Sequence, residues 1–113
     1  MTMIGPTLIC LTYRRPEMFE RMAQSVAEAA ALFTHLTGLD VQKVCVNQDP
    51  ADAVTTARAL ARGWEVWTPG QNLSFAVGNN RAARLALGSA LVLINNDLVM
   101  NELTLIRMWE QRA

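Results

Sequence analysis

The sequence of 113 residues lacks the features that mark several large classes of protein. Its ten basic and ten acidic side chains cancel, and no basic run exceeds two residues, which argues against a nucleic-acid-binding or anionic-membrane surface. No apolar run is long enough to span a membrane, and no basic region precedes the first one. We therefore expect neither a membrane span nor a signal peptide.

Cysteine and glycine-rich motifs are also scarce. Cys10 and Cys45 lie inside apolar runs and not at metal-ligand or redox spacing, which indicates two reduced core residues and suits a cytoplasmic protein. A dinucleotide-binding fold needs a glycine-rich turn after its first strand, where this chain has Arg14, Arg15 and Pro16, and no P-loop lysine is present. If the protein binds phosphate, it holds it in another kind of site.

The sequence does contain enough apolar material for one core. Hydrophobic residues make up 51% of the chain and charged residues 18%, which argues against a disordered tail. The length is that of one domain, so we interpret residues 1–113 as a single unit.

Four short apolar runs rich in β-branched residues predict strands at 7–13, 41–47, 64–68 and 90–96. The first and fourth are apolar almost throughout, which is typical of strands covered on both faces, so we expect them to form a central pair. The third run alternates and suits a sheet edge.

Helical patterns fill the gaps between these runs. A helix is predicted after Pro16, with an apolar stripe of Phe19, Met22, Val26, Ala29, Phe33 and Leu36. A second is expected to open at Asp49 and Pro50, a third to run from about Ser74 to Leu87, and a last one to begin at Leu103. Gly38, Gly63 and Gly88 are expected to close the first three helices in left-handed C-caps. Alternation of strands and helices predicts a mostly parallel α/β sheet with right-handed crossovers.

Ligands of open α/β sheets bind beyond the carboxyl ends of the strands, and the sequence turns polar at those ends. The polar residues that follow the four strands are Thr12 and Tyr13, Asn47 to Asp49, Gln71 and Asn72, and Asn95 to Asp97. These amides, one phenol and two carboxylates are expected to share one rim.

The stretch from Asn72 to Asp97, NLSFAVGNNRAARLALGSALVLINND, resembles the region of family 2 glycosyltransferases that joins an asparagine-bearing loop and helix to the metal-binding strand end. TLICLTYRRPEMFERMAQSV is similar to the first strand and helix of that family, and VCVNQDPAD to its second strand, where an acidic residue usually binds the base. The resemblance implies a three-layer, Rossmann-like GT-A fold, of which the chain holds the N-terminal, donor-binding part.

The resemblance also implies a divalent metal, Mg²⁺ or Mn²⁺, which neutralises charge on the departing pyrophosphate of a nucleoside-diphosphate sugar. Asp97 is the expected ligand. Many relatives carry the first aspartate of an Asp-x-Asp motif at the position of Asn95. A rhamnosyltransferase-like branch of the family has asparagine at this position as well. The alternative is that Asp97 caps a turn into the last helix.

Each of the remaining candidates for UDP- or dTDP-sugar binding also has a plainer interpretation. Thr12 and Tyr13 either contact the nucleobase or only finish a strand, and Arg15 either meets phosphate or is solvated. Asp49 either binds the nucleotide or caps the second helix. Asn72 and Asn80 either contact ligand or tie loop to helix through a buried amide. Asn96 belongs to the strand-end group, and the amides of Asn47 and Gln48 are suited to a pyrimidine edge.

Sugar transfer with inversion needs a general base, which in the family lies downstream of the metal site. Glu102 and Glu110 are the only later carboxylates, and both are expected on the surface of the last helix. Two functions therefore remain open: a glycosyltransferase acting on an unknown acceptor, with a base from elsewhere, or a non-catalytic nucleotide-sugar-binding module. A weaker third alternative is a scaffold whose last strand edge pairs with another chain. As a further expectation, a second copy of the chain or a partner chain completes the fold.

Overall fold

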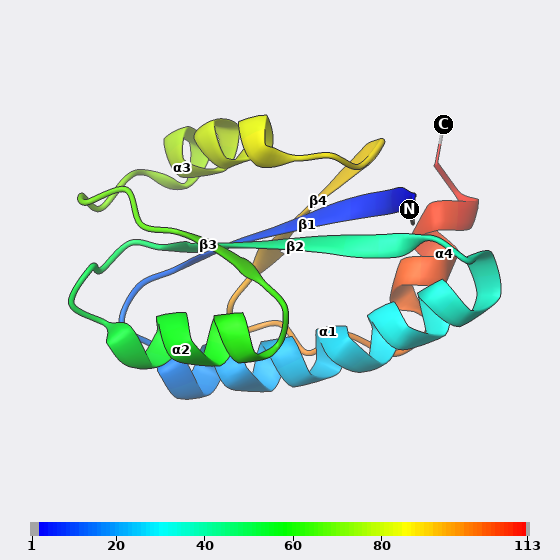
Figure 1. The fold of residues 1–113 in the computed structure, drawn as a ribbon, viewed down its shortest axis with the longest axis horizontal. Helices are drawn as coiled ribbons and strands as arrows, with labels where there is room; N and C mark the ends of the chain where they lie inside the picture. Colours follow the sequence, from blue (N-terminus) through cyan, green and yellow to red (C-terminus); the bar gives the residue numbers. More distant parts are fainter. Residues whose placement is uncertain (1–2, 113) are drawn as a thin grey trace.

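Four parallel strands form the centre of the molecule (Figure 1). The computed structural model describes residues 3–112. The strands are β1 (Ile4–Thr12), β2 (Asp40–Asn47), β3 (Glu65–Trp67) and β4 (Ala90–Asn95), in the order β3-β2-β1-β4. Each lies within or overlaps one of the four predicted runs, and all neighbours are parallel. The predicted α/β class is confirmed.

The central pair was predicted wrongly, because β1 and β2 occupy the centre while β4 lies at an edge. β4 is apolar on both faces, and Ile94 is its one fully buried residue. Ile94 is buried against α1 and its neighbours, whereas Leu91 and Leu93 are half exposed on the opposite face. Their partners in register are Thr7 and Ile9 of β1.

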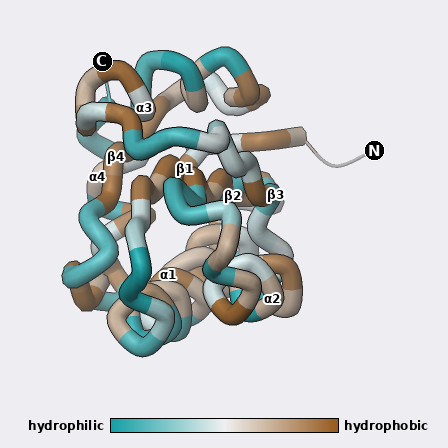
Figure 2. The backbone as a smooth tube through the Cα atoms, turned by 90° about the vertical axis from the view of Figure 1, so that its left-hand side faces the viewer, coloured by the Kyte–Doolittle hydropathy of each residue, from teal (hydrophilic) through white to brown (hydrophobic). Residues whose placement is uncertain are grey.

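The helices cover the two faces of the sheet unequally (Figures 1 and 2). They are α1 (Pro16–Thr37), α2 (Ala53–Ala61), α3 (Phe75–Ala82) and α4 (Thr104–Glu110). α1 and α2 lie on one face, where residues of α4 join the same core, and α3 lies over β1 and β2 on the other. Among residues 3–112, none of the helices has both the length and the apolar character needed to cross a bilayer.

The larger core lies between the sheet and α1, which buries five of its six predicted stripe residues. Leu36 is the exception, at 58% exposure, because it lies in the last turn of the helix. Two aromatic contacts fix the helix at both ends. Phe19 meets Trp64 edge-on with ring centroids 5.4 Å apart, and Phe33 meets Trp109 of α4 in the same way at 5.5 Å.

The third helix is shorter than predicted. α3 ends at Ala82 and continues as a 3₁₀ turn over Ala83–Leu85, and the chain then becomes extended at Ala86. Gly38 and Gly63 adopt the predicted left-handed conformation, but Gly88 does not. Gly88 is needed for close approach instead, since a Cβ there would lie 2.5 Å from the carbonyl oxygen of Gly5.

Candidate functional site

The carboxyl ends of β1, β2 and β4 meet at one rim, as predicted. Thr12 lies beside Asn47 in register, and Leu11 beside Asn95. Two hydrogen bonds tie the strand ends together: the Asn96 side-chain amide donates to the Thr12 hydroxyl (2.9 Å), and the Gln48 backbone N–H donates to the Thr12 carbonyl (3.0 Å). Thr12 is therefore the central residue of the rim.

Two clefts open at this rim. The first, of about 390 Å³, is lined by Leu11, Thr12, Tyr13, Arg15, Met18, Gln48 and Asn96. The second, of about 360 Å³, is lined by Glu17, Met18, Arg21, Asp97 and Leu98. Met18 borders both, so the clefts adjoin along the first turn of α1. The structure thus brings Thr12, Tyr13, Arg15 and Asn96 together in one cleft and places Asp97 in the next.

Gln48 holds a loop at the first cleft. Its side chain is buried, and its carbonyl oxygen accepts a hydrogen bond from the Leu73 backbone N–H at 2.6 Å. This bond fixes the loop between β3 and α3 to the end of β2. The amide nitrogen of Gln48 has no acceptor among the described residues, which leaves it as a donor beside the cleft.

Asn47 is a structural residue rather than a free recognition group. Its amide nitrogen donates to the Asp52 carbonyl and to the Thr56 hydroxyl, each at 2.9 Å, and its oxygen accepts the Asp49 N–H at 3.2 Å. Because these bonds use both ends of the buried amide, Asn47 fixes the turn into α2.

Asp49 forms an ion pair and does not cap α2, which removes the capping alternative for this residue. Asp52 is the N-cap and accepts from the Thr55 N–H at 3.0 Å. Asp49 instead accepts from Nε of Arg14 at 2.7 Å and from the Ala51 N–H. Together these donors lower the pKa of the Asp49 carboxyl, with the Arg14 hydrogen bond as the larger cause. The helix starts later than predicted because the Asp49 side chain closes a turn at Ala51.

Arg14 adopts an unusual backbone conformation at this ion pair. Its φ is +53°, and it is the single non-glycine residue with positive φ among residues 3–112. Its guanidinium carbon lies 4.7 Å from the centre of the Tyr13 ring, within the range of a cation–π contact. Tyr13, Arg14 and Asp49 therefore form one polar cluster that links the ends of β1 and β2.

Asp97 is exposed and shares its cleft with a second carboxylate, Glu17. Asn95 is exposed too, and its carbonyl accepts from the Leu98 N–H at 3.2 Å in the turn that follows β4. Within the described chain, no three His, Cys, Asp or Glu residues gather closely enough to hold a metal by themselves. Any cation here would need ligands in addition to the side chains.

Asn72 and Asn80 do not line either cleft. Both are exposed, and the buried asparagine of α3 is their neighbour Asn79, whose amide donates to the Phe75 carbonyl at 2.9 Å. Ser74 caps the helix by accepting the Val77 N–H at 3.2 Å. The tie expected between loop and helix is therefore made by other residues.

Sequence reasoning missed Glu17, Met18 and Arg21, which supply much of the second cleft. A signal for them was present, because a helix that follows a parallel strand begins at the carboxyl edge of the sheet. Residues of its first turns therefore border that edge. The apolar stripe of that helix indicates its buried face alone.

No protein-family model matches the sequence, and no curated protein matches it. Solved structures do. Residues 1–349 of TarS from S. aureus superpose with a TM-score of 0.75 at 17% identity, over 93% of this chain and 31% of that one. A longer TarS structure gives 0.71 at 16% identity, over 93% and 19% of the two chains. Mannosyl-3-phosphoglycerate synthase from Rubrobacter xylanophilus gives 0.63 at 16%, over 83% and 31%.

The chain has a GT-A fold. These neighbours are glycosyltransferases with that fold, so the predicted fold is confirmed. The chain spans about a third or less of the length of each of them. At 16–17% identity the likeness concerns the fold, and it identifies neither family 2 nor its rhamnosyltransferase-like branch.

Proposed function

We propose that this chain binds a nucleoside-diphosphate sugar, with a uridine or thymidine base, as the donor-binding part of a glycosyltransferase. The observation that carries the proposal is the pair of adjoining clefts around Met18, at the carboxyl rim of a GT-A sheet. A nucleotide sugar is long enough to occupy both. The base and ribose would lie beside Tyr13 and Gln48, and the sugar end toward Asp97.

The start of α1 suits the diphosphate. Arg15 precedes the helix and makes no side-chain cap, and Pro16 has no N–H. The backbone N–H groups of Glu17 and Met18 are therefore the free donors of the first turn. The positive end of a 22-residue helix thus borders both clefts, and Arg15 and Arg21 add cationic side chains there. Backbone donors, helix dipole and arginine together favour phosphate oxygens.

Mg²⁺ or Mn²⁺ fits the second cleft in chemical terms. Hard cations of this kind bind through one or two carboxylates, water and substrate phosphates, and need no complete protein cage. Asp97 and Glu17 would supply the carboxylates. When bound, the cation would neutralise charge on the leaving diphosphate. Asn95 is a weaker candidate ligand, since it does not line this cleft.

The metal role of Asp97 is tested by calorimetric titration of a UDP- or dTDP-sugar with and without Mg²⁺. We expect the cation to tighten binding at least tenfold, about 1.4 kcal/mol, and Asp97→Ala to remove that gain. Glu102→Ala is the matched control, because Glu102 is also exposed but lies outside both clefts. Absence of binding to every nucleotide sugar tried would overturn the proposal.

A non-catalytic binding module is the second candidate, because no carboxylate other than Glu17 and Asp97 lines the clefts of the described chain. Neither is free to act as a base if both hold the cation. Release of nucleoside diphosphate, measured with and without candidate acceptor sugars, separates the two functions. Turnover supports the transferase, and binding without turnover supports the module.

A further inference from the structure

The turn from β1 into α1 is made by three residues. β1 ends at Thr12 and α1 begins at Pro16, so the chain reverses its direction between them (Figure 1). The ring of Pro16 fixes its φ at about −65°, and the residue before a proline is restricted as well, which agrees with a φ of −135° at Arg15. The left-handed step of the turn therefore falls on Arg14, whose φ is +53°.

This backbone conformation is unfavourable for arginine. Residues with a Cβ atom adopt the left-handed region about fivefold to thirtyfold less readily, and glycine is the usual residue there. Surrounding contacts must therefore hold Arg14 in place. Its Nε donates to the Asp49 carboxylate at 2.7 Å, and its guanidinium carbon lies 4.7 Å from the centre of the Tyr13 ring. Two contacts of these kinds together are similar in size to the backbone cost.

Asp49 is the fixed partner of this ion pair. Its side chain is 13% exposed, whereas that of Arg14 is 65% exposed. Its other carboxylate oxygen accepts the Ala51 N–H at 3.0 Å, and its own N–H donates to the Asn47 side chain at 3.2 Å. Because Asp49 is held at the end of β2, the ion pair places Arg14 relative to that strand end.

The conformation of Arg14 determines where the groups on either side of it lie. Tyr13 and Arg15 flank it and line the first cleft. Glu17 and Met18 follow in the first turn of α1 and line the second cleft, which Met18 shares with the first. A different φ at Arg14 would shift the start of α1, with its free N–H donors, relative to the end of β1.

We propose that Asp49 is a positioning residue for donor binding, which holds Arg14 in its left-handed conformation and thereby keeps Tyr13, Arg15 and the start of α1 in place. This inference rests on the proposed function and assigns how its site is held in shape. Asp49 lines neither cleft, so it acts through Arg14 and not by contact with the nucleotide. The property of Arg14 that the site needs is its backbone conformation and not its charge.

Two substitutions at Arg14 separate conformation from charge, with UDP and Mg²⁺ as the calorimetric probe. Arg14→Gly removes the charge but adopts a positive φ easily, so UDP affinity should stay within about twofold of the parent. Arg14→Ala removes the same charge and keeps a Cβ atom, so affinity should fall at least about fivefold. A loss of affinity in Arg14→Gly, or none in Arg14→Ala, overturns the proposal.

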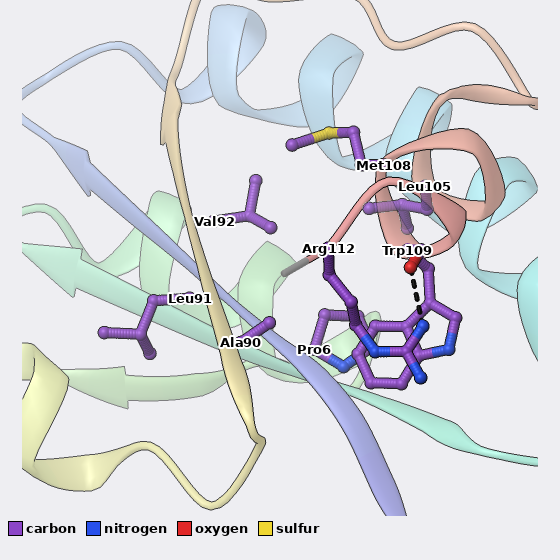
Figure 3. A pocket seen from close by; sticks show the side chains of 8 residues that line it. All are labelled: Pro6, Ala90, Leu91, Val92, Leu105, Met108, Trp109 and Arg112. Atoms are coloured by element: carbon purple, nitrogen blue, oxygen red, sulfur yellow. Dashed lines mark hydrogen bonds between the residues drawn. The ribbon is translucent and has the colours of Figure 1, made fainter.

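Arg112 provides the matched control. Its guanidinium carbon lies 3.8 Å from the centre of the Trp109 ring (Figure 3), so it too is an exposed arginine stacked on an aromatic side chain. It pairs with no carboxylate of residues 3–112 and lines neither cleft. Arg112→Ala should therefore leave UDP affinity unchanged, which shows that loss of a stacked arginine does not by itself weaken binding.

A double variant tests whether Asp49 acts through Arg14. Asp49→Asn alone should weaken UDP binding at least about fivefold, because Arg14 loses the partner that holds its conformation. Adding Arg14→Gly should restore the affinity of the parent, since glycine needs no such partner. An Asp49→Asn variant that binds like the parent overturns the proposal. So does a double variant that binds as weakly as Asp49→Asn, because Asp49 would then contact the nucleotide itself.

The conformation of residue 14 can also be measured without nucleotide. The one-bond coupling between Cα and Hα in NMR spectra distinguishes positive from negative φ. It should report positive φ at Arg14 in the parent and shift toward the value for negative φ in Asp49→Asn. A positive φ that persists in Asp49→Asn overturns the proposal. A parent that binds no nucleotide refutes the proposed function, whereas this coupling still decides whether Asp49 holds Arg14.

Discussion

Gln42 makes the connection between α3 and β4 depend on one buried side chain. It is 6% exposed and uses both ends of its amide. The oxygen accepts from the Thr7 hydroxyl and the Leu87 N–H, each at 2.7 Å. The nitrogen donates to the Leu85 carbonyl at 2.9 Å and to Glu65 at 2.6 Å. Replacing Gln42 by methionine keeps the length of the side chain but removes all four hydrogen bonds.

The cost follows from the groups left behind. The Thr7 hydroxyl is fully buried and loses its acceptor, which costs about 1–3 kcal/mol. Leu85 and Leu87 are exposed residues, so water can replace part of their lost bonds, at about 1 kcal/mol for the two. We expect Gln42→Met to lower the free energy of unfolding by about 2–4 kcal/mol, a large share of a typical 5–15 kcal/mol.

Urea unfolding followed by circular dichroism measures this loss. Gln24→Met is the matched control, since Gln24 is exposed on α1 and makes no side-chain hydrogen bond among the described residues. Glutamine and methionine have similar helix propensities, so the control should change stability by less than about 0.5 kcal/mol. A loss below about 1 kcal/mol for Gln42→Met would refute the cost assigned above to the unpaired Thr7 hydroxyl and backbone groups.

Two further predictions concern ionisable groups. The pKa of Asp49 is lowered from 3.8 by Arg14, so their ion pair stabilises the fold above that pH and its contribution disappears as the pH falls through the lowered value. Asp49→Asn should therefore be less stable than the parent at pH 7, and urea titrations should show this difference shrinking as the pH falls below 3.8; a difference that stays the same would contradict this. Burial raises the pKa of the Cys10 thiol, and raises that of Cys45 to about 12. Neither should react with a thiol reagent at about pH 8 in the native protein, and both should react in urea.

Much of the fold was predictable because its signals are local. The alternation of apolar runs and helical stripes specified four strands and their parallel order of connection, and Gly38 and Gly63 marked helix ends through a conformation that glycine adopts easily. The rim was predictable as well, since parallel strands end at the same edge. Thr12 and Asn96 meet there by a hydrogen bond between residues 84 positions apart.

The remaining features depend on long-range contacts that no local pattern records. The position of β4 at the edge depends on which strands pair, and its two apolar faces suggested a central strand. Position 88 requires glycine because the backbone of Gly5, which is 83 positions away in the sequence, approaches it closely. Asp49 looked like a cap because its partner Arg14 comes from another strand end. The roles of Asp97, Asn72 and Asn80 in ligand binding stay predictions.

The two aromatic contacts of α1 give the molecule built-in optical probes. Phe19, which follows the cleft residue Met18 in the sequence, touches Trp64. Phe33, 14 residues or about 21 Å further along the helix, touches Trp109, which lines the pocket between β4 and α4. With the third tryptophan, Trp67, replaced by phenylalanine, a second replacement of either Trp64 or Trp109 leaves one tryptophan at a known end of the same helix. Emission from Trp64 then reports on the packing of the first turns of α1, and emission from Trp109 reports on the packing of its C-terminal end, so changes at the two ends of the helix can be followed separately.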